Sequence, residues 1–128
     1  MYYEVLKFII HKNICKTNHK YINCSIVRAF ITINKDLDSI TSILQETLKT
    51  IPFKRDYDSS FGKIATILRR YDLNENPSNL RFRFTLCMQE FFDSIPQDQC
   101  NIKDPEFIKQ SEEFAIKKFD EWILAQIT

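Results

Sequence analysis

Histidine and cysteine are the side chains with the widest chemical range in this sequence, and they are few. The chain has two histidines and four cysteines. Cys15, His19 and Cys24 have the side-chain types of half a zinc site, but no paired second half follows along the sequence. The sequence motifs of serine hydrolases, P-loop proteins and zinc peptidases are absent as well. We therefore expect no catalytic residues, no metal site and no cofactor, and we do not expect an enzyme.

Arginine and phenylalanine alternate in the tetrad Arg81-Phe82-Arg83-Phe84, a pattern that suits single-stranded nucleic acids through stacking and charge. Together with Arg69 and Arg70, the tetrad defines one alternative function, that of a small RNA-associated helical protein. The formal net charge of +1 counts against it, because such a chain has no general field that attracts phosphates. The aromatic rings are explained more simply as core residues, so we expect no nucleic-acid partner.

Apolar spacing in residues 55–95 predicts two helices joined by a polar loop. The face of the first is defined by residues at helical intervals, namely Phe61, Ile64, Ala65 and Leu68. The second is apolar nearly all round between Leu80 and Phe92. A helix that is apolar on every side has to be enclosed by other helices. We therefore predict that it is the central hydrophobic helix of a small bundle.

Further periodic segments bring the expected number of helices to six. They are expected at about 2–13, 24–34 and 36–51, then after a cap at Ser59 or Ser60, after Pro77, and from Asp104 to Gln126. One glycine and four prolines in 128 residues favour long helices over a β-sandwich. With 44% hydrophobic and 27% charged residues, the chain 1–128 is expected to be a single globular domain.

Hydrophobic runs give no sign of a membrane span or a secretory signal. No run of 18 apolar residues is present, and Glu4 and Lys7 interrupt the first apolar segment. The cysteines are therefore expected to be free thiols in a reducing compartment. Cys87 lies among apolar residues and is most simply a small core residue.

The order and spacing of several short motifs resemble the Bcl (B-cell lymphoma two) family of apoptosis regulators over most of the chain. Residues 3–12 are similar to the fourth homology motif of that family, an acidic residue followed by apolar residues, a lysine and an aromatic. Leu48 to Phe61 resembles the approach to the fourth helix of the family, and Phe61 to Arg70 resembles that helix. Asn79 to Phe84 lies where the first homology motif is expected, and Trp122-Ile123 resembles the start of the second.

The sequence also departs from the pattern of the family. The Asn-Trp-Gly-Arg signature is reduced to residues 79–83, so either Arg81 or Arg83 would take the place of the arginine of the family. The Gly-Asp pair of the third motif is replaced by Phe30-Ile31, and no membrane anchor is expected after Trp122. Losses of this kind are similar to those in viral members of the family.

The resemblance implies an all-α, Bcl-like bundle of about six to seven helices with a hydrophobic groove that binds an amphipathic helix. The residues that would line this groove are Ile33, Leu37, Ile40, Leu44, Leu48, Ile64, Ala65, Leu68, Asn79, Arg81 and Arg83. In the family, the arginine pairs with an aspartate of the incoming helix. Most of these apolar residues would also be apolar in the core of any helical bundle.

The implied function is that of a viral-type inhibitor of apoptosis, which sequesters the amphipathic death-motif helix of pro-apoptotic Bcl-family proteins. An alternative keeps the fold but assigns inhibition of innate immune signalling through an outer face. The expected location is the cytoplasm of a host cell, with peripheral attachment to mitochondria left open. The sequence also leaves open whether the chain forms a homodimer, and it does not identify the partner.

Overall fold

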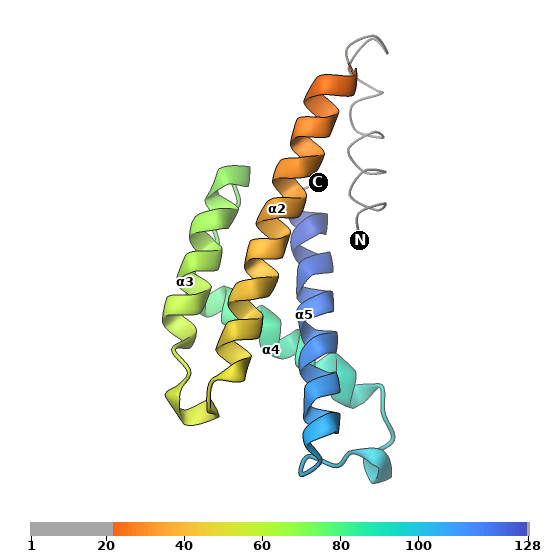
Figure 1. Ribbon diagram of the computed structural model, residues 1–128. Helices are drawn as coiled ribbons and strands as arrows, with labels where there is room; N and C mark the ends of the chain where they lie inside the picture. Colours follow the sequence, from red (N-terminus) through yellow and green to blue (C-terminus); the bar gives the residue numbers. More distant parts are fainter. Residues whose placement is uncertain (1–21, 128) are drawn as a thin grey trace. The chain divides into compact units, whose positions relative to one another are not determined.

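The computed structural model describes residues 22–127, and all regular structure in that range is helical. Within this described part, the residues up to Ser39 and residues 40–127 belong to two separate compact units. The predicted helix at 2–13 lies outside the described residues, as do Cys15 and His19. The α-helices of the described part are α2 (Ile22–Lys49), α3 (Tyr57–Leu68), α4 (Pro77–Asp93) and α5 (Pro105–Ile127), shown in Figure 1. The all-α fold class is thereby confirmed.

The number of helices differs from the prediction. The segments expected as two helices, at 24–34 and 36–51, form the single 28-residue helix α2. The predicted break rested on Asp36 and Asp38 as helix-starting residues, but no glycine or proline lies between them and residue 24. The side chains of Asn34 and Ser39 instead donate hydrogen bonds to the carbonyls four residues earlier, within the helix. The described part therefore has four α-helices, fewer than a bundle of six to seven requires.

Side-chain caps set the starts of the next helices. Asp56 caps α3 by accepting a hydrogen bond of 2.9 Å from the Ser59 amide, so the cap is neither Ser59 nor Ser60. Asn76 caps α4 in the same way through the Asn79 amide at 2.8 Å. Helix α5 begins at Pro105, as predicted, and the Asp104 carboxylate accepts from the Glu106 amide at 3.0 Å.

Three short 3-10 helices lie in the connections. They are η2 (Pro52–Lys54), η3 (Arg69–Tyr71) and η4 (Gln97–Gln99). After η3 the chain reverses at Asp72, the one non-glycine residue with positive φ in the described part, at 58°. The Leu73 amide then donates to the Leu68 carbonyl at 3.2 Å, which closes the end of α3.

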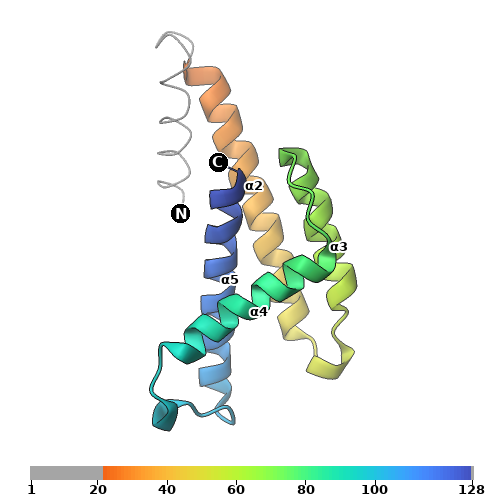
Figure 2. The same ribbon diagram turned by 180° about the vertical axis from the view of Figure 1, so that it is seen from behind.

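The core of the 40–127 unit is built on one phenylalanine from each of three helices. Phe61 of α3, Phe84 of α4 and Phe119 of α5 have ring centroids 5.8 to 6.1 Å apart in tilted or edge-to-face pairs. All three are buried, and Figure 2 shows α4 crossing α5 on its way from α3. A second cluster joins the end of α4 to the first half of α5 through the rings of Phe91, Phe92, Phe107 and Phe114.

Helix α4 is not enclosed on all sides, which corrects the predicted central helix. Its buried residues are Leu80, Phe84 and Cys87, whereas Phe82 is 65% and Leu86 is 39% exposed. Residues two apart on a helix lie about 200° apart around the axis. The alternating apolar residues therefore form two pairs with four-residue spacing on opposite faces, of which only one is covered.

Polar contacts join the last part of α2 to α3 and α5. The Thr41 hydroxyl donates to the Asp120 carboxylate of α5. The hydroxyl oxygens of Thr47 and Ser60 lie 2.6 Å apart and share a hydrogen bond between α2 and α3.

No helix within residues 22–127 is long and apolar enough to cross a lipid bilayer.

Candidate helix-docking surface

Most of the predicted groove residues lie in the interior. Ile40, Leu44, Ile64, Ala65 and Leu68 are at most 1% exposed, as is Leu37, and Ile33 is 8% exposed. Leu48 is half-buried. These side chains therefore contribute to packing rather than to an open surface, and their role in binding a partner stays a prediction.

Asn79, Arg81 and Arg83 occupy the first two turns of α4. The guanidinium carbon of Arg81 lies 4.4 Å from the ring centroid of Tyr57, which belongs to α3. The guanidinium carbon of Arg83 lies 4.9 Å from the ring centroid of Trp122, which belongs to α5. The two arginines therefore face different neighbouring helices, and each is held by a cation–π contact.

The strip of α4 between these arginines carries exposed apolar side chains. At about 100° per residue, Phe82 lies midway between Arg81 and Arg83 around the helix, and Leu86 lies one turn further along. Both are exposed, as are the polar residues Asn79 and Gln89 beside them. We call Asn79, Phe82, Leu86 and Gln89 the α4 outer face. The apolar residues of this face, Phe82 and Leu86, are four positions apart, and an arginine lies on each side of them.

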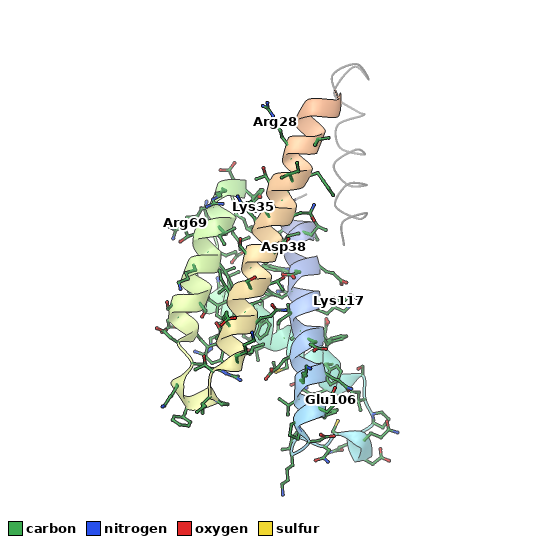
Figure 3. The ribbon with its side chains drawn as sticks, in the orientation of Figure 1. Arg28, Lys35, Asp38, Arg69, Glu106 and Lys117 are labelled. Atoms are coloured by element: carbon green, nitrogen blue, oxygen red, sulfur yellow. The ribbon has the colours of Figure 1, made fainter. Side chains whose placement is uncertain are left out.

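Charge changes sign along α4. The two arginines lie near its start, whereas Glu90 and Asp93 lie in its last turn, where the Asp93 carboxylate accepts a hydrogen bond of 2.9 Å from Gln89. A ligand that follows the helix would thus meet cations first and carboxylates later. Other charged side chains, such as Arg69 at the end of α3 and Lys117 on α5, are exposed and point outward (Figure 3).

Tyr57, which contacts Arg81 beside the α4 outer face, belongs to a network of hydrogen bonds and an ion pair around Arg55. The Arg55 guanidinium donates to the Tyr57 hydroxyl at 3.0 Å and forms an ion pair with Glu112 of α5 at 3.7 Å. It also donates to the carbonyls of Leu48 and Thr50 at the end of α2. Four contacts on one planar group restrain the turn and Tyr57 together.

Burial governs the ionisation of two groups near these helices. Desolvation raises the pKa of the Glu112 carboxyl above 4.5, and the nearby Arg55 opposes this only in part. Desolvation also raises the pKa of the Cys87 thiol above 9.0, with a smaller contribution from the negative charge of Glu90. A thiol of this kind is a poor nucleophile at neutral pH. Cys87 and Cys100 are both free.

A hollow of about 460 Å³ lies between the end of α2 and the start of α3. Nine of its ten lining residues are polar, and among them are Thr47, Ser60 and Lys63. An apolar helix face would find few partners there, so this hollow does not serve as the predicted hydrophobic groove.

Within residues 22–127, no group of three or more histidine, cysteine, aspartate or glutamate side chains is placed to hold a metal ion.

Comparison of the chain with models of known protein families, with curated proteins and with solved structures found no match.

The outer face was not predicted from the sequence as a site, although its signal is present there. The apolar pattern of α4 predicts Phe82 and Leu86 as core residues, like all other apolar residues of this helix. Their spacing of four, offset by two from Leu80 and Phe84, already indicates a second apolar strip on the same helix. What the sequence does not tell is which of the two strips the neighbouring helices cover.

Proposed function

We propose that this chain binds an amphipathic helix of a partner protein, and that it does so through the α4 outer face. The observation that carries the proposal is the exposed pair Phe82 and Leu86, one helical turn apart, with arginines on both sides. A partner helix with apolar residues at four-residue spacing and a carboxylate beside them would match both the apolar strip and the cations.

The resemblance described above names the partner class under this proposal. The partner would be the death-motif helix of a pro-apoptotic protein, and sequestration of that helix would inhibit apoptosis without any chemistry. Binding at the predicted groove would require α2 and α3 to separate, because Leu44, Ile64 and Leu68 are interior. Exposing three such side chains would cost about 1.5–3 kcal/mol each. The α4 outer face is already exposed, so it is the less costly docking site.

A binding screen against a panel of pro-apoptotic helix peptides tests the proposal by fluorescence anisotropy. At least one peptide should bind at micromolar concentration, and Phe82→Glu or Leu86→Glu should weaken it by about tenfold or more. Ile102→Glu is the matched control, because Ile102 is 70% exposed on a loop outside the α4 outer face. Equal affinity of wild type and both α4 variants would contradict docking on this face.

A covalent lock separates the outer face from the groove. Because the hydroxyl oxygens of Thr47 and Ser60 are 2.6 Å apart, cysteines at these two positions should form a disulfide between α2 and α3 in a background without the native cysteines. Peptide binding that survives oxidation supports the outer face. Peptide binding that is lost on oxidation and restored by reduction supports a groove between α2 and α3.

A second candidate function is inhibition of innate immune signalling through an outer face. The exposure of Phe82 and Leu86 favours it too, since it requires a surface patch and no groove. The peptide panel discriminates the two functions. If no pro-apoptotic helix binds at micromolar concentration, the apoptosis proposal fails and the immune-signalling proposal replaces it.

A further inference from the structure

The turn that joins α2 to α3 presents two large apolar side chains to solvent. Phe53 is 82% exposed and Ile51 is 52% exposed. Both belong to the segment around η2, which projects beyond the ends of α2 and α3 in Figure 1. An aromatic ring at the apex of a turn contributes nothing to the core, so its exposure calls for another explanation.

Several hydrogen bonds restrain the turn. The Arg55 guanidinium donates to the Thr50 carbonyl at 2.9 Å and to the Leu48 carbonyl at 2.8 Å, on the far side of the turn. The Lys54 amide donates to the Ile51 carbonyl at 2.8 Å, and Pro52 fixes its own φ within the turn. Ile51 and Phe53 are therefore presented by a preorganised turn, which lowers the entropy lost on binding.

Charge near the apex is positive. Residues 49–55 contain Lys49, Lys54 and Arg55 and no acidic residue. The Lys54 ammonium lies 5.9 Å from the centre of the Phe53 ring. Glu46 pairs with Lys49 at 3.3 Å, and Asp56 is engaged as the cap of α3. Lys54 is exposed and follows Phe53 directly in the sequence, so it is the exposed cation next to the apolar apex.

We propose that this turn docks onto the surface of a lipid bilayer that contains anionic lipids. Phe53 and Ile51 would enter the boundary between headgroups and acyl chains, and Lys54 would face the anionic headgroups. The turn projects beyond the ends of the helices that it joins (Figure 1), so its apolar side chains can reach a flat and deformable surface. Ile102 is exposed to a similar degree and is followed by one cation, Lys103. Its loop also carries Asp98 and Asp104, and Glu106 lies in the first turn of α5, so acidic residues outnumber that cation and an anionic surface would repel them.

Vesicle co-sedimentation of the full chain tests this proposal. The probes are vesicles of phosphatidylcholine alone and of phosphatidylcholine mixed with phosphatidylserine. Wild-type protein should bind the mixed vesicles more tightly, and added salt should weaken that binding. Lys54→Ala should reduce the partition coefficient about fivefold, and Phe53→Ser should reduce it about tenfold. Equal binding to both vesicle types, or no binding to either, would overturn the proposal.

Matched variants exclude general effects and separate this proposal from the proposed function. Ile102→Ser and Phe82→Ser each remove an exposed apolar side chain elsewhere and should leave vesicle binding unchanged. Phe53→Ser should leave peptide binding unchanged, whereas Phe82→Ser should weaken it. A loss of vesicle binding in Phe82→Ser or Ile102→Ser as large as that in Phe53→Ser would overturn the assignment to this turn.

Discussion

Arg55 and Glu112 form an ion pair in which the Nη2 and Oε1 atoms are 3.7 Å apart. The pair joins the turn before α3 to the first half of α5, and its side chains are only 12% and 20% exposed. Nevertheless, the pKa of Glu112 is raised rather than lowered, because the loss of hydration outweighs the attraction of one guanidinium at this distance. The contact therefore positions two elements, but ionisation of Glu112 costs stability.

This pKa shift predicts the direction of one pH effect on stability. A folded-state pKa above the unfolded value means that the folded chain holds the proton more tightly. The contribution of Glu112 is then fully present below about pH 4.5 and is lost as the pH rises through the raised pKa. Urea unfolding at several pH values should show that Glu112→Gln gains stability relative to wild type as the pH rises from acidic to neutral.

The control for that experiment is Glu113→Gln, which removes an exposed carboxylate one position further along α5. It corrects for the loss of one negative charge from the protein surface. A difference between Glu112→Gln and wild type that stays constant with pH would show that burial does not dominate at Glu112.

The three-ring core predicts a steep contrast between phenylalanines. Phe119 is fully buried and contacts both Phe61 and Phe84, so Phe119→Ala should reduce the free energy of unfolding by about 3–5 kcal/mol. Phe82→Ala should change it by only about 0.5 kcal/mol, because the ring is mostly in solvent. Chemical denaturation measures both values, and similar losses for the two variants would contradict the arrangement of α4.

Thiol reactivity should separate the two described cysteines. The Cys87 thiol is buried and its pKa is raised, so it should react with a disulfide reagent far more slowly than the half-buried Cys100 thiol. Variants that keep only one of these cysteines allow each rate to be measured in the native protein. In denaturant the two rates should converge, and a fast native rate for Cys87 would show that α4 opens.

The only glycine of the chain, Gly62, lies within α3. A Cβ atom placed on it would meet nothing within 4 Å, and its φ is not positive. Gly62→Ala should therefore stabilise the protein by about 0.5–1 kcal/mol, since alanine has the higher helix propensity and lowers the entropy of the unfolded chain. Thermal unfolding measures the gain. Destabilisation would mean that α3 has to bend at this residue.

The sequence predicts a helix boundary well where capping residues and proline mark it. The start of α5 follows from Asp104-Pro105-Glu106, because proline at the first turn and an acidic cap act within a few residues. The predicted boundary inside α2, at Asp36 and Asp38, was wrong. Aspartate favours the start of a helix only where a preceding helix has already ended. Without proline or glycine, one helix continues through residues 34–38.

The periodicity of apolar residues does not predict which apolar side chains are buried. Leu68 and Phe82 are equally apolar in a one-dimensional pattern, yet one is 0% and the other 65% exposed. The difference depends on which faces of α3 and α4 meet their neighbouring helices. Such contacts join residues that are far apart in the sequence, and short motifs do not encode them. For the same reason, most residues predicted to line a groove lie in the interior, whereas Phe82 and Leu86, predicted as core residues, are exposed.

Trp122 gives the molecule a built-in optical reporter. It is the only tryptophan in the chain. Its ring contacts the Phe119 ring, with centroids 6.0 Å apart, and the Arg83 guanidinium, whose carbon lies 4.9 Å from the ring centroid. All tryptophan emission therefore originates at the α5 edge of the α4 outer face. A ligand that draws Arg83 away from the indole would change its emission, so occupancy of this surface is readable without any label.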